Sequence, residues 1–147
     1  MIKSVGVFAL VLLGSVAACA RKPETLQELV ARADSAKTDQ QPKFYMDAAE
    51  LQHKAATDAL KANREDEFHT DLNDIVQYCD KAHAAAINSK KHVKDTEIRI
   101  RRISSHLKEM KLDADVDDQP IIQKVIDQLE HFRTELLLSL FGGKGND

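Results

Sequence analysis

Apolar residues recur at helical spacing along most of the chain, and the longest such pattern lies in its second half. It alternates spacings of four and three residues without a slip. Its members are Phe68, Leu72, Ile75, Cys79, Ala82, Ala86, Ser89, Val93, Thr96, Ile100, Ile103, Leu107 and Met110. Because this period keeps one face of a helix apolar, the pattern predicts one long coiled-coil-like helix over about residues 65–111. The alternative is a break near Asn88 and Ser89, but a break normally shifts the phase of the pattern, and no shift is visible.

Shorter helical patterns flank this seam on both sides. The first begins near Pro23 and the second at Pro42, since proline is favoured in the first turn of a helix. The third follows a turn over residues 113–120. The apolar positions are Leu26, Leu29, Val30 and Ala33 in the first helix, Phe44, Ala48, Leu51, Ala55, Ala59 and Ala62 in the second, and Ile122, Val125, Ile126, Leu129, Phe132, Leu136, Leu137 and Leu140 in the last. We therefore expect an all-α fold, an elongated antiparallel helical bundle formed by a single domain over residues 24–141, with a flexible tail over residues 142–147.

Composition and charge are compatible with such a bundle and exclude other classes. Five Gly and three Pro in 147 residues are too few for a turn-rich β-sandwich. Residues 24–80 carry 13 acidic and 6 basic side chains, residues 81–111 carry 3 and 9, and residues 112–147 carry 8 and 3. This alternation suits a basic segment packed antiparallel to acidic neighbours, and it is a poor match to nucleic-acid binding.

The N-terminus has the features of an export signal. Lys3 precedes an apolar run from Val5 to Val16, which is shorter than the roughly 20 residues of a membrane-spanning helix. The segment Val16-Ala17-Ala18-Cys19 resembles the lipobox of bacterial lipoproteins, an aliphatic residue followed by two small residues and a cysteine. The resemblance implies a signal peptide over residues 1–18, cleavage before Cys19 and lipidation of that cysteine, with residues 19–23 as the anchored N-terminus and a short linker.

The residue after this cysteine bears on location. In bacterial lipoproteins an Asp at this position favours retention at the inner membrane, whereas this chain has Ala20. The resemblance therefore implies a protein anchored in the bacterial cell envelope, at the outer membrane facing the periplasm in a host that has one. The alternative is an ordinary secretory signal cut after Ala20, because Ala18-Cys19-Ala20 also has the A-x-A form.

A second, weaker resemblance concerns the domain itself. Residues 44–87 are weakly similar to a tetratricopeptide-type helical hairpin, which implies two antiparallel helices over this stretch. The helices look longer than in that family, its Gly positions are absent, and no second copy of the pattern follows.

Two groups of residues resemble metal ligands. Asp113, Asp115 and Asp117 have the spacing that opens an EF-hand calcium loop, but Asp118 occupies the Gly position and Lys124 the position of the bidentate Glu. We interpret this segment as an acidic turn between helices, with Asp117 or Asp118 capping the last helix.

The other ligand-like residues are the pairs Cys79 with His83 and Glu65 with His69, each one helical turn apart. Cys79 lies on the apolar seam, where packing explains it. The chain carries no Gly-rich phosphate loop, nucleophile elbow or His-x-x-x-His motif. We therefore expect no catalytic residue, no metal and no cofactor, and we do not expect an enzyme.

One basic stretch could contact polyanions such as lipid head groups or envelope polymers. It contains Lys90, Lys91, Lys94, Arg99, Arg101 and Arg102. The plainer interpretation is a solvated face partly neutralised by Asp95, Glu97 and the acidic last helix.

These observations predict a non-catalytic cell-envelope lipoprotein with a helical protein-interaction module. The alternative is a structural lipoprotein that docks on polyanionic envelope components through the basic segment 90–102. The expected partners are the membrane, through the lipid anchor, and another envelope protein, with no nucleic acid. The sequence defines neither that partner nor the oligomeric state.

Overall fold

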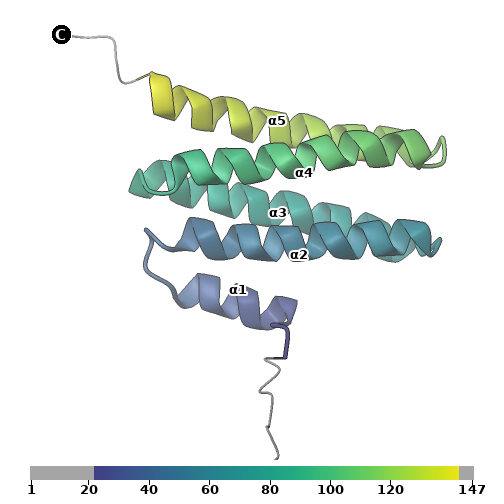
Figure 1. Cartoon of the computed structure of the whole chain (residues 1–147), viewed down its shortest axis with the longest axis horizontal. Helices are drawn as coiled ribbons and strands as arrows, with labels where there is room; N and C mark the ends of the chain where they lie inside the picture. Colours follow the sequence, from purple (N-terminus) through teal and green to yellow (C-terminus); the bar gives the residue numbers. More distant parts are fainter. Residues whose placement is uncertain (1–21, 143–147) are drawn as a thin grey trace, which may run out of the picture.

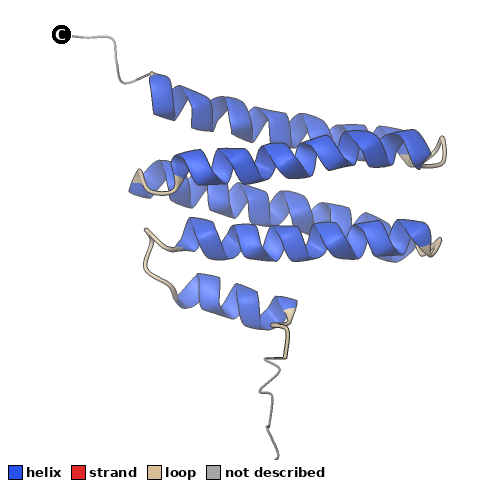
Figure 2. Cartoon of the chain, viewed as in Figure 1, coloured by secondary structure: helices blue, strands red, loops and turns tan. Residues whose placement is uncertain are grey.

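The protein is all-α, as the sequence predicts. A computed structural model describes residues 22–142, and the regular secondary structure of this part of the chain is entirely helical (Figure 2). The helices are α1 (Leu26–Ser35), α2 (Gln41–Lys61), α3 (Glu65–Ser89), α4 (Val93–Asp113) and α5 (Gln119–Phe141). The predicted signal peptide, Cys19 and residues 143–147 of the predicted tail lie outside the described residues.

The helices form two antiparallel hairpins that lie one on the other. Helices α2 and α3 make the first hairpin and α4 and α5 the second, and α1 packs on α2 (Figure 1). Helix α2 lies beside α4 and α3 beside α5, so each pair of stacked helices runs in the same direction. Within residues 22–142, no helix combines the length and the apolar composition needed to cross a membrane.

The prediction of one continuous helix over residues 65–111 is wrong. The chain reverses direction between Ser89 and Val93, and Lys90 and His92 take left-handed backbone conformations with φ of 55° and 58°. The hydroxyl of Ser89 helps to end α3, because it donates to the carbonyl of Ala85 (2.7 Å) and accepts from the backbone N–H of Lys91 (3.2 Å). Serine competes for backbone hydrogen bonds in this way at helix ends.

The seam nevertheless identifies the core of both helices. Its members from Phe68 to Ala86 are buried in α3, and those from Val93 to Met110 are buried in α4. The turn lies within one four-residue spacing of the pattern, from Ser89 to Val93. The apolar pattern therefore shows no shift of phase where the chain turns. An apolar pattern shows which face of a helix is buried, and it carries no information on the direction of the chain.

Two details of the first helices also differ from the prediction. Helix α1 begins at Leu26, after Pro23, because Thr25 forms a capping box with Glu28 at distances of 3.0 and 3.3 Å. The predicted apolar stripe of α2 is largely wrong, because only Ala48 and Ala59 of its six residues are buried. The buried residues of α2 are Pro42, Tyr45, Met46, Ala48, Ala49, Gln52, Ala56 and Ala59. The reason is that α2 is covered by three helices, α1, α3 and α4.

Candidate functional site

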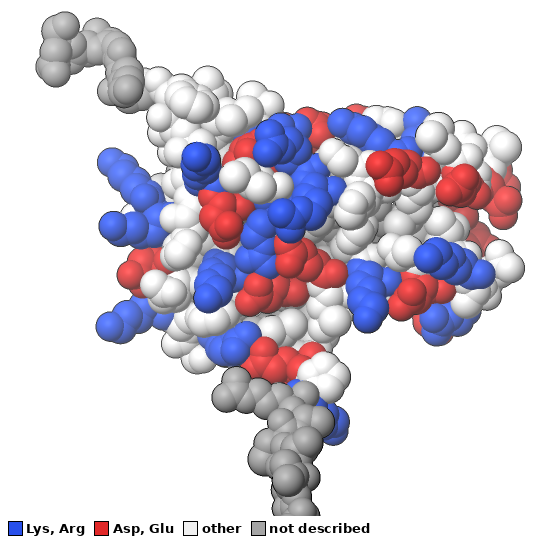
Figure 3. Space-filling view, viewed as in Figure 1, with Lys and Arg blue, Asp and Glu red and all other residues white. Residues whose placement is uncertain are grey.

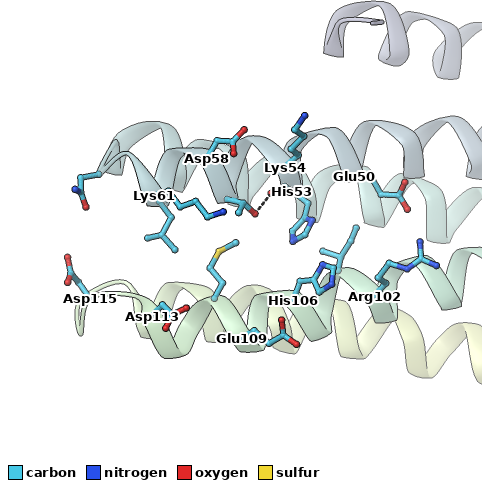
Figure 4. A pocket seen from close by; sticks show the side chains of 15 residues that line it. Glu50, His53, Lys54, Asp58, Lys61, Arg102, His106, Glu109, Asp113 and Asp115 are labelled. Carbon is cyan, nitrogen blue, oxygen red and sulfur yellow. Dashed lines mark hydrogen bonds between the residues drawn. The ribbon is translucent and has the colours of Figure 1, made fainter.

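A groove of about 770 Å³ lies between α2 and α4 (Figure 4). Its walls come from the C-terminal half of α2, from Glu50 onward, and from the part of α4 that follows Arg102. It continues to the end of the molecule where the α2–α3 and α4–α5 turns lie, since Asn63 and Asp115 line it. Its volume falls within the range of ligand-binding pockets in proteins.

An ion-pair cluster holds the two helices together where the groove begins. The guanidinium of Arg99 on α4 donates to both carboxylate oxygens of Glu50 (2.8 Å each) and to Oδ1 of Asp47 (2.6 Å) on α2. The hydrogen bonds from Arg99 hold the pKa of Glu50 below its ordinary value, against burial, which acts in the opposite direction. We call these three residues the Arg99 clamp.

The groove has an apolar floor and a charged rim. Leu60, Ile103 and Met110 line it, and the last two are almost fully buried. The rim carries both signs of charge: Lys54, Asp58 and Lys61 on α2, and Arg102, Glu109 and Asp113 on α4 (Figure 4). Such a surface suits a ligand with an apolar side and charged groups at its edges.

Two histidines face one another across the groove. The rings of His53 on α2 and His106 on α4 are stacked, with centroids 5.3 Å apart and planes at 21° (Figure 4). Burial lowers the pKa of His53, and the neighbouring His106 lowers it further, whereas Glu50 acts in the opposite direction. The lowered pKa favours the neutral form of the His53 imidazole. Its Nε2 is buried and has no hydrogen-bond partner among the described residues.

The predicted basic residues do not form one surface. Lys90 and Lys91 lie in the α3–α4 turn with Lys94 just after it, at an end of the molecule where basic side chains project (Figure 3). Arg99 belongs to the clamp, and only 13% of its side chain is exposed. Arg101 and Arg102 are exposed on α4, and Arg102 lines the groove. The polyanion prediction therefore retains a smaller cluster, Lys90, Lys91 and Lys94.

The Cys79–His83 pair is part of the packing. Cys79 is fully buried, as predicted, and burial raises the pKa of its thiol far above the ordinary range. His83 stacks on Phe132 of α5 with ring centroids 5.2 Å apart, and its Nε2 lies 2.8 Å from Glu135. In the described part of the chain, no third ligand joins this pair.

The Glu65–His69 pair has a neighbour that the sequence did not indicate. Nε2 of His69 on α3 lies 2.7 Å from Oδ1 of Asp118, at the start of α5. Asp118 stands at the N-cap of α5, but its side chain makes no capping hydrogen bond. The Glu65–His69 pair and the aspartate run over residues 113–118 are separate motifs in the sequence, because 49 residues separate His69 from Asp118.

Comparisons of this chain with protein-family models, with curated proteins and with solved structures find no match.

Proposed function

We propose that the protein is a non-catalytic cell-envelope lipoprotein whose helical domain binds a partner protein in the α2–α4 groove. The observation that carries this proposal is the groove itself, with an apolar floor and a rim of both charges. The lipobox resemblance at Val16–Cys19 supports an anchor at the membrane, which would raise the local concentration of the domain near other envelope proteins.

The occupant that fits this groove best is an amphipathic helix of another envelope protein. The groove runs along two parallel helices, so a third helix can lie in it with one apolar stripe over Leu60, the partly exposed residue of the apolar floor. Charged residues beside that stripe would meet the mixed rim, as the flanking charges of coiled coils do.

Affinity capture from detergent-solubilised membranes tests the proposal. We expect wild-type protein to retain a partner that the double variant Lys54→Glu, Arg102→Glu loses, because both charges on the rim are reversed. Lys124→Glu on α5 is the matched control, since this exposed lysine lies away from the groove. Equal capture by all three proteins would contradict the proposal.

The alternative function is docking on polyanionic envelope components. The cluster of Lys90, Lys91 and Lys94 supports it, because these side chains form no ion pair within residues 22–142. Binding of this kind would weaken steeply with rising salt and would be lost in the triple variant Lys90→Glu, Lys91→Glu, Lys94→Glu. The same variant would leave binding in the groove unchanged.

A further inference from the structure

We propose that Glu65, His69 and Asp118 form a binding site for a divalent transition-metal ion of the zinc type. Each residue offers one ligand atom, and the three atoms lie within 4.8 Å of one another. Glu65 and His69 are one turn apart at the start of α3, and Asp118 comes from the opposite hairpin, just before α5. The two closest ligand atoms, His69 Nε2 and Asp118 Oδ1, are already 2.7 Å apart. Glu65 is exposed, so its side chain can turn toward an ion.

The surroundings of the three residues carry an excess of negative charge. A small cavity of about 160 Å³ adjoins them, and Glu65, Asp115, Asp117 and Asp118 all line it. Arg64 is the one basic residue of this lining, and its guanidinium lies 2.6 Å from Glu67. The N-termini of α3 and α5 each contribute a partial positive charge of about one half, which together is small beside these four carboxylates. A divalent cation would relieve their repulsion.

The donor set selects the class of metal. One imidazole nitrogen with two carboxylate oxygens suits zinc and its neighbours in the first transition row, whereas calcium and magnesium prefer oxygen ligands alone. Three protein ligands leave a coordination position for water, as in open zinc sites. We therefore expect a reversible site that is weaker than a closed structural site with four protein ligands.

The site would connect the two hairpins. His69 belongs to the first hairpin and Asp118 to the second, so an ion between them would stabilise their stacking at this end of the molecule. The adjoining cavity shares Leu60, Asn63 and Asp115 with the α2–α4 groove, which places the metal beside the end of the groove. The inference does not depend on the proposed partner, because its test measures metal binding alone.

Zinc titration of the chelator-stripped protein, purified without a histidine tag, tests this site. We expect one equivalent of Zn²⁺ to bind and to raise Tm, since an ion that binds only the folded state stabilises it. Glu65→Gln and His69→Ala should each weaken the affinity about tenfold or more. His131→Ala is the matched control, because His131 is 68% exposed and lies about 20 Å from Asp118 along α5. This variant should bind zinc as the wild type does.

The same titration separates a metal site from a simple ion pair. If His69 and Asp118 only pair with one another, His69→Ala will lower Tm in the absence of zinc, and zinc will not raise the Tm of the wild type. Absence of Zn²⁺ binding at concentrations up to about 1 mM would overturn the proposal. Binding that Glu65→Gln and His69→Ala leave unchanged would overturn it as well. The Glu65→Gln variant keeps the test conclusive, because Glu65 is exposed and forms no ion pair within residues 22–142. We therefore expect this variant to fold, and a change in its zinc affinity reports on the metal site.

Discussion

Among the described residues, Arg99 makes the side-chain hydrogen bonds that join α4 to α2. Its guanidinium joins Asp47 and Glu50 on α2 and also donates to the carbonyl oxygen of Lys43 (3.2 Å). Hydrogen bonds to charged groups stabilise proteins more than neutral ones do. Because Glu50 and Asp47 are partly exposed, solvent screening reduces the contribution of the pairs.

We expect Arg99→Met to lower the free energy of unfolding by about 1–3 kcal/mol, because two partly buried carboxylates lose their partner. Arg101→Met is the control and should change it by less than about 0.5 kcal/mol, since Arg101 is exposed. Urea denaturation of the two variants measures both values. An equal effect of the two substitutions would show that the clamp does not hold the helices together.

The clamp also predicts a pH dependence. The pKa of Glu50 is lower in the folded protein than its ordinary value of 4.5, so the ionised carboxylate stabilises the fold above that pH. This contribution is lost as the pH falls through the lowered pKa. Denaturation between pH 3 and pH 6 should therefore show a steeper loss of stability in the wild type than in Arg99→Met. Parallel curves would contradict the assignment.

At the scale of helices, the sequence predicts the buried faces better than the ends. The apolar seam correctly identifies the core positions of α3 and α4, because burial imposes a period on each helix. The turn between the two helices has no comparable signal in the sequence, since residues 90–92 contain neither Gly nor Pro. Lys90 and His92 adopt left-handed conformations that are normally costly for L-residues.

The turn between α3 and α4 gives the prediction at this scale. Lys90→Gly should raise the free energy of unfolding by up to about 1 kcal/mol, because glycine takes the left-handed conformation without the cost of a Cβ atom. Lys91→Gly is the control, since Lys91 does not have a positive φ, and it should lower stability through the added freedom of the unfolded chain. Thermal unfolding compares them. A loss of stability in Lys90→Gly would show that the left-handed conformation is not strained.

At the scale of the whole molecule, the stacking of the hairpins creates features that no local pattern contains. The sequence has no second copy of the 44–87 pattern, yet a second hairpin lies on the first and forms the groove with it. His53 and His106 meet across that groove, and His69 meets Asp118, although each partner is remote in the sequence. The alternation of acidic and basic segments predicted that the basic segment packs against acidic neighbours. It did not predict that Arg99 would be largely buried in an ion-pair cluster.

Anchoring gives a prediction for the whole molecule. If Cys19 carries the proposed anchor, Cys19→Ser should move the protein from the detergent-extracted membrane fraction to the soluble fraction, or leave it as an uncleaved precursor, because a serine hydroxyl does not replace the thiol that is lipidated in bacterial lipoproteins. Mass spectrometry of the mature N-terminus is the measurement. A wild-type protein that begins at Arg21 and carries no lipid would contradict the proposal and support an ordinary secretory signal.

The measurement that tests the proposed function most directly is photo-crosslinking in intact cells. A photoreactive amino acid replaces Thr57, which lines the groove, or Gln128 on α5, which does not. We expect one discrete protein adduct from position 57, its loss when Lys54→Glu and Arg102→Glu are added, and no corresponding adduct from position 128. The same adduct from both positions, or an adduct from position 57 that survives both charge reversals, would contradict the α2–α4 groove as the binding site.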